Sequence, residues 1–199
     1  MSVWPDSFTV EGDFVAVEPL SMAHHDDLVE AVNDGELYRL WYTAVPRPEL
    51  VKAEIERRFG LRASGSMLPF AIIDKHSGRA VGMTSYMNID AANKRVEIGS
   101  TWYRRSVQRS ALNTECKLLL LTHAFEKLGC ICVELRTHAM NMQSRRAIER
   151  LGAKLDGILR ANAIIPNGSI RDTAVYSITA PEWPAVKANL SWQLEKPRE

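Results

Sequence analysis

The chain has 199 residues, of which 46% are hydrophobic and 25% are charged. This is the composition of an ordinary globular protein with an ample core, and we expect a single domain over residues 1–199. A formal net charge of +1 gives no reason to expect nucleic acid or an anionic membrane as the main partner.

The first residues of the chain, its apolar stretches and its cysteines indicate the cellular compartment. The first residues lack a basic segment followed by an apolar run, and no apolar stretch is long enough to span a bilayer. Cys116, Cys130 and Cys132 are an odd number of cysteines, and none has a metal-ligand spacing to histidine. We therefore expect a reduced, cytoplasmic setting and no metal site.

The first part of the chain predicts one strand followed by helices. Phe14 to Glu18 reads as a short strand, and Ser21 can cap the helix that follows it. After Pro46 and Pro48, apolar residues at a four-residue spacing predict another helix. Such helices usually pack against a face of the sheet. The alternative is that they form the walls of a substrate groove.

The middle of the chain predicts a mixed sheet. Pro69 to Asp74 and Ala80 to Met87 read as a β-hairpin, which Arg95 to Tyr103 would extend. A helix then leads into a further strand, Ile131 to His138, and the short connections predict a parallel crossover. The loop before that helix should lie at the carboxyl end of a strand, where α/β proteins bind ligands.

The strand before that loop alternates in character. Val96 and Ile98 fall on one face, whereas Glu97, Gly99 and Thr101 fall on the other. We therefore expect Glu97 to point away from the apolar face.

The loop itself is basic and runs directly into a helix. Arginines within residues 104–109 precede a helix that begins near Thr114 and ends at Gly129. The unpaired amides and positive dipole of a helix start make an anion site. Glu115 lies in the first turn, where we expect a capping role. The loop is a candidate site for a phosphorylated ligand, and a basic solvated turn is the alternative.

A second helix start follows the next strand. Asn141 is placed as the N-cap of a short helix that Gly152 ends, and Ser144 lies in its first turn. Read alone, these are an ordinary cap and an ordinary serine. Because adjacent parallel strands would each lead to a helix start, we expect one cleft with hydrogen-bond donors on both sides.

The end of the chain predicts two further strands and a tail. Gly152 to Ala161 and Thr173 to Thr179 read as strands joined by a turn at residues 166–168. Trp183 to Glu199 is expected to be a docked or fraying tail. The fold class is therefore α/β, with a mixed sheet.

Several of these motifs, in this order, resemble one family over nearly the whole chain. They are Glu97-Ile98-Gly99, the loop from Gln108 to Asn113, Asn141-x-x-Ser144 with Leu151-Gly152, and Arg171-Asp172 through Tyr176 to Glu182-Trp183. This set resembles the GCN5-related N-acetyltransferases (GNAT), specifically the RimJ/RimL-type branch. The resemblance implies a single-domain GNAT-like fold with a mixed, mostly antiparallel central sheet and helices on both faces. A parallel strand pair would splay around acetyl-coenzyme A (acetyl-CoA).

The resemblance also implies which residues bind the cofactor, with the amides of the loop holding its pyrophosphate. These residues are Thr101, Trp102, Tyr103, Gln108, Arg109, Ser110, Ala111, Leu112, Asn113 and Asn141. The family pattern has glycine where Ala111 stands and a small residue where Asn113 stands. Glycine is favoured where backbone approaches a ligand closely, but alanine fits if the loop is simply the first helical turn.

Two residues are implied in the chemistry. An α-amino group, with a pKa of about 8, attacks a thioester only when it is unprotonated. Glu97 is the candidate base, directly or through a water, and amides around Ile98 to Thr101 can stabilise the oxyanion. Ile148 stands where many relatives carry a tyrosine as the general acid, and the resemblance to the RimL branch implies Ser144 in that role instead. Ser144 could then protonate, or hydrogen-bond to, the departing thiolate. The alternative for Glu97 is an exposed carboxylate paired with Lys94 or Arg95.

The resemblance thus implies an enzyme that moves an acetyl group from acetyl-CoA to a primary amine. The acceptor would be an amine-bearing small molecule, a peptide or a protein amino terminus, as in ribosomal-protein acetylation. Acetyl or other acyl transfer to a small amine or antibiotic, and noncatalytic acyl-CoA binding, are the alternatives. Fold alone does not choose among them, and a homodimer is left open.

Overall fold

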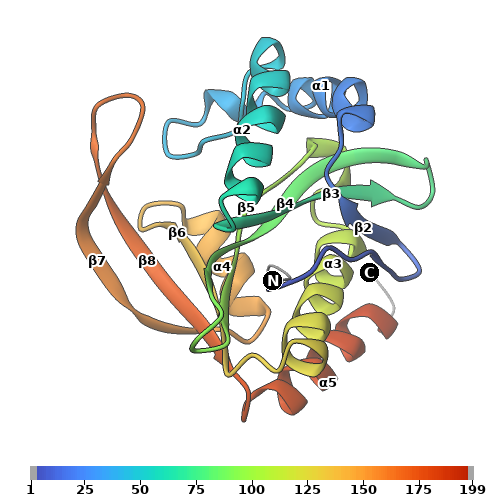
Figure 1. Ribbon diagram of the computed structural model, residues 1–199, viewed down its shortest axis with the longest axis vertical. Helices are drawn as coiled ribbons and strands as arrows, with labels where there is room; N and C mark the ends of the chain where they lie inside the picture. Colours follow the sequence, from blue (N-terminus) through green and yellow to red (C-terminus); the bar gives the residue numbers. More distant parts are fainter. Residues whose placement is uncertain (1–3, 197–199) are drawn as a thin grey trace.

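A computed structural model describes residues 4–196, and its strands form one eight-stranded sheet in the order β1-β2-β3-β4-β5-β6-β8-β7 (Figure 1). The strands are β1 (Val10–Glu11), β2 (Val15–Pro19), β3 (Met67–Asp74), β4 (Arg79–Asp90), β5 (Arg95–Tyr103), β6 (Cys132–His138), β7 (Lys154–Ile164) and β8 (Ile170–Thr179). Neighbouring strands are antiparallel, except that β5 and β6 are parallel. The predicted mixed sheet is confirmed.

Helices cover both faces of the sheet, as expected (Figure 1). The helices are α1 (His25–Asn33), α2 (Val51–Ala63), α3 (Ala111–Thr122), α4 (Met142–Arg150) and α5 (Trp183–Glu195). One core cluster joins α1 and α2 to the sheet, and the other joins α3, α4 and α5 to its opposite face. The sheet is therefore the middle layer between two helical layers.

The C-terminal segment is docked. α5 packs against α3, and Trp183 stacks on Phe125 with 5.1 Å between the ring centroids. Residues 197–199 of the predicted tail lie outside the described residues. No helix among residues 4–196 is long and apolar enough to cross a bilayer.

The parallel pair β5 and β6 separates soon after it begins. Its pairing runs through Arg95 with Cys132 and Val96 with Val133, and ends at Glu97 with Glu134. β6 continues to pair with β8 as far as His138, whereas the described part of β5 beyond Glu97 has no partner in β6. The predicted splayed pair is therefore present, and one edge of β5 faces an opening.

A bulge in β5 changes which side chains share a face. Ser100 adopts a positive φ of 50°, and the pairing of β4 with β5 shifts register there. After it, Thr101 faces α3, where its hydroxyl accepts a hydrogen bond from Lys117, and Trp102 packs with α1 and α2. The prediction that Thr101 shares a face with Glu97 was wrong, because the bulge inserts one residue into the alternation.

Candidate active site

The loop before α3 is built by its own side chains. Ser110 caps the helix, since its Oγ accepts from the Leu112 amide at 3.2 Å and donates to the Val107 carbonyl at 2.7 Å. Gln108 Nε2 donates to the Tyr103 carbonyl at 3.0 Å. The side chains of Gln108 and Ser110 therefore shape the loop and aim the helix start.

The two residues that replace the small residues of the family pattern both lie in helical backbone. α3 begins at Ala111 rather than near Thr114, so both Ala111 and Asn113 lie in the first helical turn. Between residues 108 and 113 the positive φ, 61°, belongs to Arg109. Alanine takes helical angles readily, and the first-turn amides still point out of the helix start. The loop retains the backbone geometry of an anion site.

The arginines of this loop divide into two kinds. Arg104 Nε lies 2.9 Å from Asp34 Oδ2, in the segment after α1, so its charge is neutralised. Arg105 and Arg109 are exposed and form no ion pair with any residue between 4 and 196. These two arginines supply the positive charge beside the helix start.

Glu115 has a different role from the predicted cap. Its carboxylate accepts hydrogen bonds from the amides of Asp13, Phe14 and Val15 at 2.7–2.8 Å. A Cβ added at Gly12 would lie 2.4 Å from its Cδ, so the turn needs glycine there. Glu115 therefore ties the β1–β2 turn to α3, because its side chain leaves the helix sideways rather than toward its amino end.

Glu97 is buried on the face of β5 that carries α1 and α2. It is 5% exposed, and its Oε2 accepts from Asn88 Nδ2 at 2.6 Å and lies 3.5 Å from Arg136 Nε. Burial raises the pKa of Glu97 despite these two partners. The alternative of an exposed carboxylate paired with Lys94 or Arg95 was wrong; Arg95 pairs instead with Glu134.

The ends of β6 and β8 form a hollow on the same face. His138 is 4% exposed, and the edge of Trp41 packs against its ring at a centroid distance of 5.1 Å. A cavity of about 470 Å³ is lined by His138, Ala139, Met140, Arg160, Ala161, Ile170 and Asp172. Burial lowers the pKa of His138, so the imidazole presented to this cavity is neutral at pH 7.

The second helix start has the predicted cap. Asn141 Oδ1 accepts a hydrogen bond from the Ser144 amide at 3.0 Å, and α4 follows β6 directly. The Ser144 hydroxyl is partly exposed and makes no hydrogen bond to any described residue. Ile148 is buried in the core. Ser144 therefore has a free hydroxyl donor at this helix start.

Other residues predicted to contact the cofactor have buried side chains. Trp102 packs against α1 and α2, while Tyr103, Ala111 and Leu112 pack on the α3 face. The main chain of these residues, rather than their side chains, borders the opening. The hydroxyls of Thr101 and Thr84 form a hydrogen bond with 2.7 Å between their oxygens.

The predicted residues therefore lie on two sides of one opening. The loop from Gln108 to Asn113 lies with α3 on one face of the sheet, and Glu97 lies on the other. Between them runs the edge of β5 that is unpaired with β6 beyond Glu97. No group of three or more His, Cys, Asp or Glu side chains within residues 4–196 is arranged to hold a metal ion.

A family model for the acetyltransferase (GNAT) domain matches residues 15–154, which run from β2 to the start of β7. The chain belongs to the GNAT acetyltransferase family. The predicted family, fold class and enzyme class are thereby confirmed.

Relatives agree with this assignment. A GCN5-related N-acetyltransferase from Brucella melitensis is 33% identical, with a TM-score of 0.85 over 96% of this chain and 86% of that one. YdaF of Bacillus subtilis (strain 168), provisionally named a ribosomal N-acetyltransferase, is 31% identical over 112 residues. That match covers 56% of this chain and 60% of YdaF, which is less than two thirds of YdaF's length. Mycobacterium smegmatis RimJ, solved with CoA-disulfide, shares the fold at 20% identity and a TM-score of 0.79, over 97% of each chain.

Several residues of this site carried no signal in the sequence. Arg58 lies in a polar-looking stretch of α2, yet it is 2% exposed and contacts β5. Asn88 holds Glu97 from a backbone position with a φ of 47°. Lys117 lies among leucines in α3 and is 5% exposed. Each of these placements depends on the register of strands or on a contact distant in sequence.

Proposed function

We propose that this protein transfers an acetyl group from acetyl-CoA to the amino terminus of a protein or peptide, of the ribosomal-protein type. The observation that carries the proposal is the opening beyond Glu97 and Glu134, with a basic helix start on one face and a buried carboxylate on the other. The similarity to YdaF, which is named a ribosomal N-acetyltransferase, supports the acceptor class. Residues 1–199 would act as one domain, in the cytoplasm, where ribosomal proteins are made.

The opening has groups that fit each part of acetyl-CoA. The free edge of β5 from Ile98 to Tyr103 offers amides and carbonyls to the two amides of the pantetheine arm. The α3 amides, with Arg105 and Arg109 beside them, suit the pyrophosphate. Asn141 and α4 lie across the opening, after β6. When bound, the cofactor supplies the activated acetyl thioester.

Glu97 is suited to accept the proton of the attacking amine. Because burial raises its pKa, its carboxylate is a stronger base than an exposed glutamate. Asn88 and Arg136 hold the carboxylate in place without removing it from the cleft face. The proton can pass to Glu97 directly or through one water.

Two roles remain, which are to stabilise the oxyanion and to donate a proton or hydrogen bond to the departing thiolate. The bulge in β5 suits the first role, and Ser144 suits the second. Main-chain amides near Ser100 lie where β5 has left β6, so they can donate to the negative charge that develops on the thioester oxygen. Ser144, with its free hydroxyl at the start of α4, can donate to the departing thiolate. Neither role requires a metal ion.

The test is a thiol-release assay with acetyl-CoA and a panel of acceptors. The panel should hold amino-terminal peptides of ribosomal proteins, the same peptides with blocked amino termini, and small amines including aminoglycosides. We expect release with free peptides, none with blocked ones, and a mass increase of one acetyl group at the α-amine. Release with small amines alone would overturn the acceptor class. Cofactor binding without release to any amine would indicate a noncatalytic binder.

A further inference from the structure

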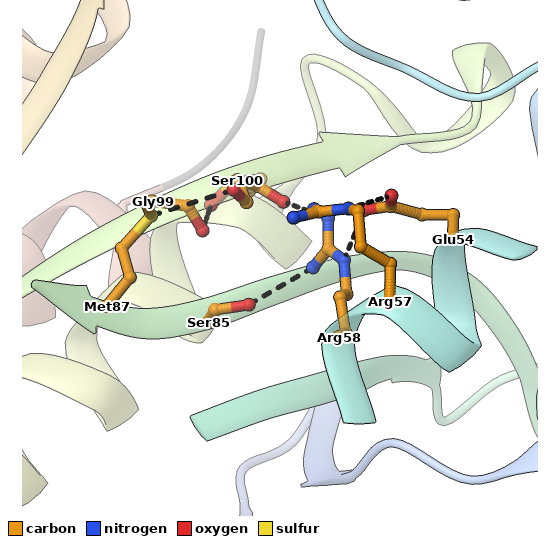
Figure 2. Close-up of polar contacts among 8 residues, drawn as sticks. Glu54, Arg57, Arg58, Ser85, Met87, Gly99 and Ser100 are labelled. Carbon is orange, nitrogen blue, oxygen red and sulfur yellow. Dashed lines mark hydrogen bonds and ion pairs between the residues drawn. The ribbon is translucent and has the colours of Figure 1, made fainter. Parts of the chain in front are cut away.

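A buried arginine reaches from α2 to the bulge in β5 (Figure 2). Arg58 is 2% exposed, and each of its three guanidinium nitrogens donates one hydrogen bond. Its Nε donates to Glu54 Oε1 at 2.7 Å, its Nη1 to Ser85 Oγ at 3.1 Å and its Nη2 to the Ser100 carbonyl at 3.0 Å. One planar side chain therefore joins α2, β4 and β5.

The contacts on the sheet lie at the irregular part of the β4–β5 pair. Ser85 pairs with Gly99, immediately before one of the two register shifts in this pair, and Ser100 has a positive φ. A serine in this conformation is disfavoured unless its surroundings hold it. Arg58 supplies such a hold, because it binds the Ser100 carbonyl on the α2 side, away from the opening.

The charge of Arg58 is balanced by Glu54. Although burial opposes ionisation, hydrogen bonds from Arg57 and Arg58 lower the pKa of the Glu54 carboxyl. Arg57 binds the same carboxylate, through Nε at 2.7 Å and Nη2 at 2.9 Å (Figure 2), but it is exposed and donates no hydrogen bond to the described residues of β4 or β5. Arg57 and Arg58 are thus adjacent arginines with one shared partner, and they differ in their contact with the bulge.

We propose that Arg58 is a positioning residue for the acetyl-transfer step, an inference that rests on the proposed function. By holding the Ser100 carbonyl toward α2, it keeps the neighbouring bulge amides directed at the opening between β5 and β6. Those amides are then oriented before the reaction, which is the condition under which oxyanion donors are most effective. Arg58 acts through the backbone of β5 and touches no substrate.

The test compares Arg58→Met, Arg58→Lys and the matched control Arg57→Met. Steady-state kinetics give kcat and KM for acetyl-CoA, and hydrogen exchange gives the opening of the Ser100 and Thr101 amides without cofactor. We expect Arg58→Met to lower kcat by about tenfold or more, since the loss of one oxyanion donor costs about 10²–10³-fold. KM for acetyl-CoA should change little, and amide exchange at the bulge should be faster. Arg58→Lys should recover part of kcat, and Arg57→Met should match the wild type within about twofold.

A folded Arg58→Met protein with wild-type kcat and wild-type exchange would overturn the proposal. If Arg58→Met does not fold, Arg58→Lys and Ser85→Ala are measured in its place. Faster amide exchange at Ser100 together with a lower kcat in these variants supports the proposal. Wild-type exchange and wild-type kcat in both variants overturn it. If the wild type releases no thiol to any acceptor, the proposed function fails, whereas the exchange experiment still tests the hold on the bulge.

Discussion

Two buried cations lie on opposite faces of β5, and their surroundings differ. Arg58, on the α2 face, pairs with Glu54 and donates to two strands. Lys117, on the α3 face, donates to the Thr101 hydroxyl at 3.1 Å and pairs with no carboxylate among residues 4–196. Burial lowers the pKa of both, but the Arg58 guanidinium stays charged at neutral pH, whereas the pKa of Lys117 falls to about 8.

A buried cation has different effects with and without a counter-ion. A cation with a counter-ion keeps its charge and can fix the backbone that it binds. A cation without one lowers the stability of the fold at neutral pH. On the α2 face Arg58 is paired with Glu54 and fixes part of β5, whereas on the α3 face Lys117 has no counter-ion among the described residues and reduces stability.

The largest expected effect is on kcat and comes from removing the Glu97 carboxylate. Glu97→Gln should lower kcat by about 10²–10⁴-fold at neutral pH, because the amine loses its proton acceptor. The loss should shrink as pH rises and free amine appears. Glu134→Gln, on the neighbouring strand, removes a carboxylate paired with Arg136 and should lose far less. Wild-type turnover in Glu97→Gln with a confirmed acceptor would refute the base assignment.

The wild-type pH profile tests the same residue without substitution. Because burial raises the pKa of Glu97, its carboxylate takes up a proton at a higher pH than an ordinary glutamate does. The acidic limb of kcat/KM should therefore lie above the usual range near 4.5 and should disappear in Glu97→Gln. An acidic limb that stays in place in the variant would assign it to another group.

The next effect is on stability, at Lys117. Its folded pKa of about 8 lies below the ordinary 10.5, so the unfolded chain binds more protons between these values and stability rises with pH across them. Below about pH 8 the full penalty is present, about 3 kcal/mol. Lys117→Met should therefore raise the free energy of unfolding at pH 7, with a gain that fades toward pH 10.5. Denaturant unfolding of both proteins at several pH values gives this difference, and equal stability at pH 7 would contradict it.

The sequence predicted features that arise locally and missed those that depend on register. Asn141 was predicted as a cap, and its partner lies three residues away. The cap at Ser110 was not predicted, because the helix that it begins was expected to start near Thr114. Glu115 was expected in the first turn of a helix beginning near Thr114, but α3 begins at Ala111 and Glu115 binds amides about 100 residues away, so the predicted capping role was wrong. The bulge at Ser100 depends on how β4 meets β5, which simple alternation along one strand does not contain.

A smaller effect is expected at the free hydroxyl of α4. Ser144→Ala should lower kcat by about tenfold, the weak end of acid–base assistance, because the departing thiolate loses a donor. Cofactor affinity should stay unchanged, since a transition-state contact does not contribute to ground-state binding. Ser144→Cys, which restores a proton donor, is the comparison. A raised Kd for the cofactor with normal kcat would contradict this role.

The smallest effect is expected at the cap of the same helix. Asn141→Ala should destabilise the fold by about 1 kcal/mol and weaken cofactor binding, because the Ser144 amide loses its acceptor. Asn141→Asp retains an acceptor and should stay near wild type. Thermal unfolding with and without acetyl-CoA measures both quantities. Identical melting curves for Asn141→Ala and the wild type, with and without acetyl-CoA, would show that the cap contributes to neither stability nor cofactor binding.

The central claim is that one ligand spans the opening, with its pyrophosphate at the start of α3 and its acetyl group near Glu97. Calorimetry with acetyl-CoA and with an acetyl-pantetheine that lacks the nucleotide and both phosphates tests it most directly. The account predicts much weaker binding of the truncated thioester, and a smaller difference when Arg105 and Arg109 are both replaced by methionine. Equal affinity for the two ligands in the wild type would contradict it.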